Sequence, residues 1–163
     1  MTRHAHAIAA VRYPGIRKRL EYRCRCFIII AIALATFSPR GMAQNIKIVP
    51  GMKVKLDGAI SVVIQGNFTN GGSFDAGAAS TTTFSNSSPA SLTGATTFNN
   101  LAKSGGGDLT LNSDVTVNGT LALTSGNIIL GSNNLTLGTA ATVSGAPSAA
   151  NMVVASGTGE MRK

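Results

Sequence analysis

The sequence has 163 residues and a formal net charge of +8, with 14 basic side chains against 6 acidic ones. Eight of the basic residues and one acid precede residue 44, so the rest of the chain carries six basic and five acidic side chains. This nearly neutral remainder lacks the basic surface that nucleic-acid binding requires, which excludes nucleic acid as a partner.

Histidine and cysteine occur only in the same N-terminal stretch, at His4, His6, Cys24 and Cys26. After residue 43 the sequence therefore offers no disulfide, thiol nucleophile, imidazole base or Cys/His metal site. These absences argue against catalysis, and we predict that the chain is not an enzyme and uses no cofactor.

The N-terminal segment has the order of a signal peptide, with a basic region followed by an apolar run and small residues. The uncharged run Cys26–Phe37 is about a dozen residues long, against the ~20 that a membrane-spanning helix needs. We predict that residues 1–43 are removed between Ala43 and Gln44, which makes the protein secreted or cell-surface, with no stable membrane span after cleavage. An uncleaved anchor or a buried core helix is the alternative.

Residues 44–163 are rich in small and polar residues, but their apolar residues recur in ordered pairs. One residue separates the members of each pair, which places both side chains on one face of a strand. Successive pairs begin six or seven residues apart, and the Asn, Asp, Ser and Gly residues between them favour tight turns. The pairs are Leu109 and Leu111, Val115 and Val117, Leu121 and Leu123, Ile128 and Leu130, and Leu135 and Leu137.

Such short strands could form an open antiparallel meander or a stack of coils. In an open meander they would bury little surface. Stacked coils bury more, because three units make a coil of ~20 residues and each inward side chain lies ~4.8 Å from its counterpart in the next coil. The sequence therefore predicts an all-β fold, a β-solenoid of the right-handed parallel β-helix type, with no helix after residue 43.

We divide this β-region at residue 66. We expect residues 44–66 to form N-terminal strands that cap the core. Ile60, Val62 and Ile64 should lie on one side of these strands and Val63 on the other. Residues 67–163 predict the solenoid itself, which begins with less regular coils that have single inward residues. These inward residues are Phe68, Phe74, Phe84, Leu92, Phe98 and Leu101.

The C-terminal end offers less apolar surface to close the core. After Val143 the sequence has one thin strand, Met152–Ala155, and then a glycine-rich segment and a charged tail. A solenoid whose last coil is uncovered exposes apolar side chains and unpaired strand edges. We therefore expect this end to fray or to associate end to end with a second copy.

Several segments together resemble the β-strand-repeat surface proteins of the Bacteroidetes: residues 65–70, 83–84, 97–101, 109–126, 131–138, 143–145 and 156–159. The resemblance covers residues 60–163. It implies a secreted or surface-attached, adhesin-like protein of large size, with a C-terminal sorting domain for type IX secretion. The sequence ends at Met161–Lys163 without such a domain, so we expect an N-terminal fragment of a longer protein, truncated at its C-terminus.

The acidic residues after position 43 are too scattered to predict a catalytic site. A polysaccharide-cleaving β-helix needs several carboxylates in one groove, and a glycosidase needs two at a defined separation. Only Asp108 and Asp114 are close in sequence, six residues apart, so they could lie on consecutive corners. The complete set is Asp57, Asp75, Asp108, Asp114 and Glu160.

A weak calcium candidate lies in the same region. Three glycines at 105–107 precede Asp108, Asn112 and Asp114, whose oxygens are of the hard type that calcium prefers. The glycine-rich calcium repeat of other solenoids is not repeated here, so an ordinary glycine-rich corner is the competing interpretation.

Outward threonines offer another candidate surface. Thr110, Thr116 and Thr136 lie between inward residues, and stacked threonines could form a flat ladder like that of ice-binding solenoids. Ala122 takes the equivalent outward place in the third unit and interrupts the ladder. Threonine is also simply a good exposed strand residue.

Our leading hypothesis is a non-enzymatic structural or adhesive surface module, whose ligand, if it is adhesive, is an unidentified glycan or protein. The alternative is a carbohydrate-active β-helix, which needs convergent carboxylates and aromatic platforms for sugars. The chain has no Trp, and its two tyrosines, Tyr13 and Tyr22, precede residue 44. A truncated reading frame without independent function is the third interpretation.

Overall fold

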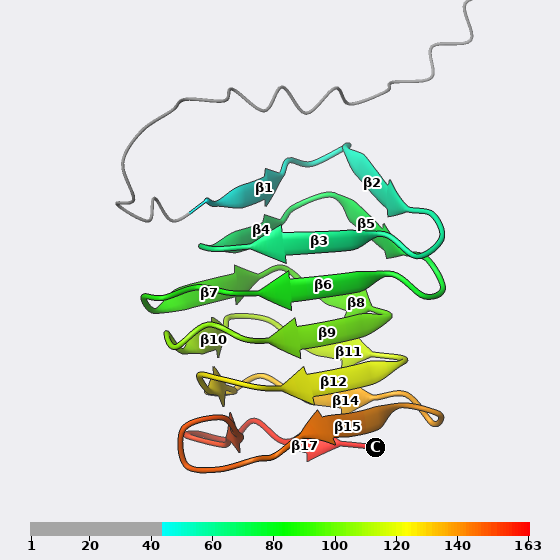
Figure 1. Ribbon diagram of the computed structural model, residues 1–163. Helices are drawn as coiled ribbons and strands as arrows, with labels where there is room; N and C mark the ends of the chain where they lie inside the picture. Colours follow the sequence, from blue (N-terminus) through cyan, green and yellow to red (C-terminus); the bar gives the residue numbers. More distant parts are fainter. Residues whose placement is uncertain (1–43) are drawn as a thin grey trace, which may run out of the picture. The chain divides into compact units, whose positions relative to one another are not determined.

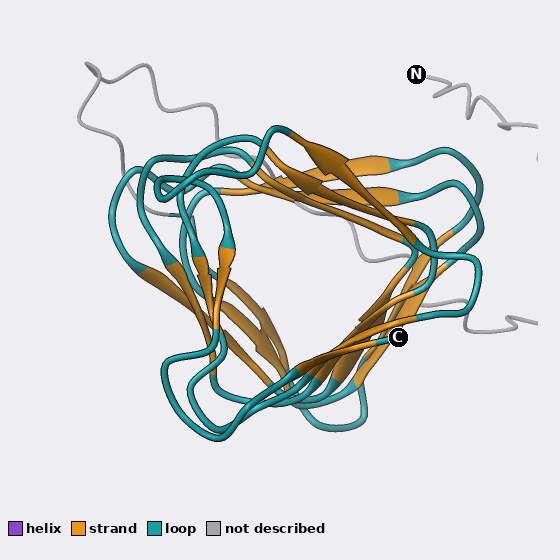
Figure 2. Cartoon of the chain, turned by 90° about the horizontal axis from the view of Figure 1, so that it is seen from below, coloured by secondary structure: helices purple, strands orange, loops and turns teal. Residues whose placement is uncertain are grey.

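The computed structural model describes residues 44–163, and this part of the chain contains strands and turns but no helix. Three short strands separated by corners make one turn, and the turns stack on one another (Figure 1). Viewed along the stack, the described chain encloses a three-sided section (Figure 2). The predicted signal peptide, residues 1–43, lies outside the described residues.

The first face of the stack is a six-stranded parallel sheet, in which each strand pairs with the strand three places further along the chain. Its members, in spatial order, are β1 (Ile46–Ile48), β4 (Phe68–Asn70), β7 (Ala90–Thr93), β10 (Leu109–Leu111), β13 (Ile128–Ile129) and β16 (Val153–Val154).

The second face is divided into two parallel sheets. Its members, in chain order, are the pair β2 (Lys53–Leu56) and β5 (Ser73–Ala76), then the four strands β8 (Thr96–Phe98), β11 (Val115–Val117), β14 (Leu135–Leu137) and β17 (Met161–Arg162).

The third face is a five-stranded parallel sheet. Its members are β3 (Ser61–Ile64), β6 (Thr81–Phe84), β9 (Asn100–Lys103), β12 (Thr120–Leu123) and β15 (Thr142–Gly145).

The register of the strands confirms the predicted β-solenoid. Leu109 lies between Ala90 and Ile128, so the chain returns to the same place after 19 residues in either direction. In Figure 1, β3, β6, β9 and β12 cross the near side from right to left while the chain descends, which makes the winding right-handed. This is the hand that parallel β-connections adopt, because it follows the natural twist of strands.

All ten residues of the predicted inward ladder are buried, none more than 5% exposed. Alternation along each strand causes this, since every second side chain points into the section. On the third face, for example, Leu121 stacks between Leu101 and Val143, while Ala122 faces outward. Stacked apolar side chains thus form continuous columns along the solenoid axis.

The earlier coils have the same plan with aromatic residues inside. Five of the six predicted inward residues are buried, and the sixth, Phe74, is half-buried. The ring centroids of Phe68 and Phe84 are 6.3 Å apart, and those of Phe84 and Phe98 are 6.4 Å apart, both with an edge-to-face arrangement. Aromatic rings fill this part of the core, whereas Leu, Ile and Val fill the later turns.

Residues 46–64 form strands as predicted, and these strands make the first turn of the coil, in register with β4, β5 and β6. Ile64 is buried and Val63 is 54% exposed, as expected. Ile60, which was predicted on the same side as Ile64, is 41% exposed. It precedes β3, and its N–H donates to Gly58 O.

A charge in the inward column tests this register. We expect Leu121→Asp to lower the free energy of unfolding by more than about 3 kcal/mol, because an unpaired carboxylate would be buried. The outward neighbour gives a matched control: Ala122→Asp should change it by less than about 1 kcal/mol. Denaturant unfolding followed by circular dichroism measures both values, and equal losses would contradict the assignment of inward and outward positions.

Candidate functional site

The corners of the solenoid carry a ladder of Asn and Asp side chains. At the corner before the first face, each side-chain Oδ1 accepts the backbone N–H of the aligned residue in the next turn. The donors and acceptors are Asn67 N to Asn45, Ser91 N to Asn67, Asn127 N to Asp108, and Met152 N to Asn127, at 2.8–3.0 Å. These side chains join successive turns where the strands themselves do not pair.

Asp108 and Asp114 belong to this system. The Oδ1 atom of Asp108 accepts Asn127 N at 3.0 Å, and that of Asp114 accepts Asn134 N at 2.7 Å. They lie on consecutive corners, before β10 and before β11, as their spacing of six residues suggested. Each carboxylate therefore has a structural partner in the next turn, which explains its position without catalysis.

The third calcium candidate, Asn112, donates from Nδ2 to Thr93 Oγ1 at 3.2 Å. The three candidates thus contact three different parts of the neighbouring turns. Within residues 44–163, no group of three or more His, Cys, Asp or Glu side chains is placed to hold a metal ion. The calcium site stays a prediction, and the hydrogen bonds give these residues another role.

The remaining acids lie in other turns. Asp57 follows the first-turn strand β2 and pairs with Lys55 at 3.6 Å, and Glu160 in the last turn pairs with Arg162 at 2.9 Å. Asp75 lies on β5 in the second turn. The ion pairs are exposed, so they contribute little to stability.

The outward threonines do not form one ladder. Thr116 and Thr136 are aligned on the second face, together with Thr97. Thr110 lies on the first face, between Ser91 and Ile129. The spacing of six residues between Thr110 and Thr116 is about a third of a turn, which agrees with their positions on consecutive faces. Ala122 lies on the third face, so it does not interrupt the aligned threonines of the second face, and the ice-binding ladder stays an untested candidate.

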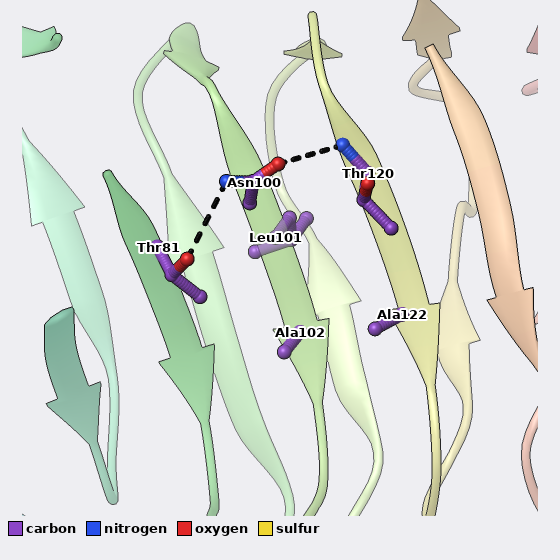
Figure 3. Close-up of a pocket in the computed structure, with 6 residues that line it drawn as sticks. All are labelled: Thr81, Asn100, Leu101, Ala102, Thr120 and Ala122. Carbon is purple, nitrogen blue, oxygen red and sulfur yellow. Dashed lines mark hydrogen bonds between the residues drawn. The ribbon is translucent and has the colours of Figure 1, made fainter. Parts of the chain in front are cut away.

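A shallow depression on the third face is the best candidate for a ligand site. Figure 3 shows the residues that line it. Its volume is about 260 Å³. Ala102 and Ala122 are aligned in neighbouring strands between Thr83 and Ser144, and their small methyl groups leave the surface hollow. The lining residues are Thr81, Asn100, Leu101, Ala102, Thr120 and Ala122.

A polar column borders these methyl groups. The Oδ1 atom of Asn100 accepts the Thr120 N–H at 2.9 Å, and its Nδ2 donates to Thr81 Oγ1 at 3.4 Å (Figure 3). The same Nδ2 also donates to Ser80 O at 3.0 Å. These bonds fix the amide, while the threonine hydroxyls, with contacts of 3.4 Å, keep hydrogen-bonding capacity for a ligand. The six lining residues carry no titratable group, so the depression offers hydroxyl, amide and methyl groups but no general acid or base.

Sequence reasoning missed this depression, although it identified Ala122 as outward. The available signal was the interval of 20 residues from Ala102 to Ala122, which equals one turn at this face. Two outward residues that are one turn apart in sequence are expected to be neighbours on the same face. Two neighbouring alanines have small side chains, so a hollow is expected above them.

Lys103 is the second feature that sequence reasoning missed. It occupies an inward position between Phe84 and Leu123, and its side chain is fully buried. Its Nζ donates to Gly105 O and, at 3.2 Å, to Ser125 O. Burial lowers the pKa of Lys103 below its usual 10.5, and the charge of Asp108 offsets part of this effect.

Gly126 completes the surroundings of this lysine. Its φ of +73° is in the left-handed region, and a Cβ atom there would lie 2.6 Å from Lys103 Nζ and 2.3 Å from Gly105 O. Glycine is therefore required at this corner both by its backbone conformation and by the space that the lysine occupies.

No protein-family model, no curated protein and no solved structure matches this chain. The part of the chain that the structure describes also has no helix of the length and apolar character needed to cross a membrane.

The ladder at the corners can be tested at Asp114. Asp114→Ala removes the acceptor of Asn134 N–H, and we expect a loss of about 1 kcal/mol in the free energy of unfolding. Asp114→Asn retains a side-chain oxygen and should stay within about 0.5 kcal/mol of the parent. Denaturant titration measures both, and an alanine variant as stable as the asparagine variant would contradict a structural role.

Lys103 predicts a dependence of stability on pH. Because its pKa is lower in the folded chain, the folded chain loses this proton first as the pH rises. The free energy of unfolding should therefore increase from the folded-state pKa up to about pH 10.5, where the unfolded chain also loses the proton, and stay lower and level below that window.

Lys103→Met is the matched variant, because it keeps the length of the side chain and removes the charge. Both proteins are unfolded with denaturant at several pH values between 7 and 11. The free energy of unfolding of the parent should increase with pH relative to that of the variant. The difference isolates Lys103 from the other lysines, and parallel pH profiles would show that Lys103 titrates normally.

Proposed function

We propose that this chain is a non-enzymatic β-repeat module of a secreted or cell-surface protein, with a structural or adhesive role. The observation that carries the proposal is the use of Asp108 and Asp114, the acids closest in sequence, as acceptors for backbone N–H groups of the next turn. A pair of carboxylates that work in hydrolysis must face the substrate, whereas these bind their own backbone.

The stacked architecture supports a structural role. Each turn contacts chiefly the turns before and after it, so stability is a sum of turn-to-turn interfaces, and the array can be extended without a new core. Such an array separates whatever is attached to its two ends. The signal-peptide pattern of residues 1–43 supports export as the setting for this role.

The depression on the third face supports an adhesive role. Hydroxyl and amide groups of Thr81, Asn100 and Thr120 lie beside the methyl groups of Ala102 and Ala122. A neutral glycan has the matching chemistry, since its hydroxyl groups alternate with apolar C–H patches. This chemistry favours a glycan over a charged ligand, and it favours binding over cleavage.

Binding to neutral polysaccharides tests the proposal. The full chain should retain a subset of immobilised neutral glycans without releasing reducing ends from them. Ala122→Arg should fill the depression and weaken binding at least tenfold. Thr116→Arg is the matched control, because it places the same side chain at an outward position on the second face, and it should leave binding unchanged.

Each result has a defined meaning. Release of reducing ends by the parent protein would overturn the non-enzymatic assignment. Equal binding by the parent and Ala122→Arg would move the ligand site away from the depression. If the protein bound none of the glycans, the proposed adhesion to glycans would be wrong.

A further inference from the structure

The depression on the third face is a short furrow that runs along the solenoid axis. Thr81, Asn100 and Thr120 form one row across β6, β9 and β12 (Figure 3). Ala102 and Ala122 form a second row beside it. Each of the three strands pairs with a neighbour on both sides, so the furrow belongs to the interior of the stack and not to its end turns. A ligand that fills the furrow therefore crosses the strands and lies parallel to the axis.

The polar row has hydrogen-bonding capacity that its own contacts leave unused. Thr81 Oγ1 accepts from Asn100 Nδ2, so the hydroxyl proton of Thr81 can be donated to a ligand. The Oδ1 atom of Asn100 accepts the Thr120 N–H and has a second lone pair, which can accept a ligand hydroxyl. Because aligned residues in neighbouring strands are ~4.8 Å apart, the row offers one polar contact per strand at a regular spacing.

The furrow carries neither a charge nor an aromatic ring. The outward side chains of its three strands are Thr81, Thr83, Asn100, Ala102, Thr120 and Ala122. A neutral ligand fits this surface, because a charged group would lose hydration without meeting an opposite charge. A single sugar has no ring to stack on and is held weakly, so affinity requires contacts with several sugars in succession.

We propose that the furrow binds a linear, neutral, β-1,4-linked polysaccharide, with its chain along the axis and one sugar above each strand. This inference rests on the adhesive role proposed above and names the class of ligand for it. An extended β-1,4-linked chain advances by close to one strand spacing, ~4.8 Å, per sugar, so successive sugars stay in step with successive strands. An α-1,4-linked chain coils instead, and it leaves the furrow after one or two sugars.

The order of side chains along the polar row agrees with the alternation in such a chain. Each sugar of an extended β-1,4-linked chain is rotated by half a turn relative to the one before it. The first and third sugars therefore present the same edge, to Thr81 and Thr120, and the middle sugar presents its other edge to Asn100. The apolar C–H groups of the sugars face the methyl groups of Ala102 and Ala122.

Frontal affinity chromatography of the full chain with soluble oligosaccharides tests the proposal. The β-1,4-linked probes are cello-, xylo- and manno-oligosaccharides of two to six sugars, and malto-oligosaccharides of the same lengths are the α-1,4-linked control. We expect at least one β-linked series to bind, with a dissociation constant that falls at least tenfold from two to four sugars and then levels off. The malto-oligosaccharide of four sugars should bind at least tenfold more weakly.

Removal of one hydroxyl group tests the polar row. Thr120→Val keeps the shape of the side chain, and it should raise the dissociation constant of the β-linked tetrasaccharide at least threefold. Thr116→Val makes the same change on the second face and should leave this constant unchanged. Circular dichroism verifies that both variants fold.

The possible failures are distinguishable. Equal binding of the α- and β-linked series would overturn the linkage, and a dissociation constant that is independent of length would overturn the axial orientation. Equal effects of the two valine variants would show that the ligand lies elsewhere. If no oligosaccharide bound but an immobilised neutral glycan was retained, this inference would be wrong and the adhesive role would stand. If neither bound, the adhesive role would be wrong as well.

Discussion

Parallel stacking of one turn on the next is the constraint on which the rest of this structure depends. Aligned residues in neighbouring turns lie ~4.8 Å apart, so each side chain must be compatible with the one before it and the one after it. In the core, columns of Leu, Val and Ile satisfy this condition. At the corners, Asn or Asp side chains satisfy it, because each accepts a backbone N–H of the next turn. The same constraint makes each turn a suitable surface for the next.

The sequence predicted the parts of the fold that depend on short intervals. The pairs from Leu109 to Leu137 alternate within strands, and alternation alone assigns them to the interior. Alignment between turns depends instead on the length of a whole turn, which ranges from 19 residues between Leu109 and Ile128 to 26 between Leu135 and Met161. Because the length of a turn varies, a coil of ~20 residues does not predict that Met161 is aligned with Leu135.

The same limit explains the missed residues at the candidate site. Lys103 is two residues after Leu101, so alternation does place it inward, but a lysine is rarely buried and its polarity argued for the surface. Its burial is possible because the carbonyl groups of Gly105 and Ser125 lie within reach of Nζ. Those carbonyls come from two different turns, and sequence spacing alone does not bring them together.

Stability is distributed unevenly along the stack. Buried side-chain oxygens without a hydrogen-bond partner in the described chain all lie between residues 70 and 86, on Asn70, Ser80, Thr82, Ser85 and Asn86. The second face is interrupted in the same region, because β5 does not pair with β8. Each buried oxygen without a partner costs about 1–3 kcal/mol of desolvation, and the break removes ladder hydrogen bonds between the second and third turns.

Aromatic packing offsets part of this cost, since the rings of Phe74 and Phe98 lie 5.5 Å apart across the break. The turns from β7 to β14 have both continuous sheets and filled apolar columns, so their interfaces contribute the most. In an array whose stability is a sum of such interfaces, the first two turns can separate from the others without disrupting them.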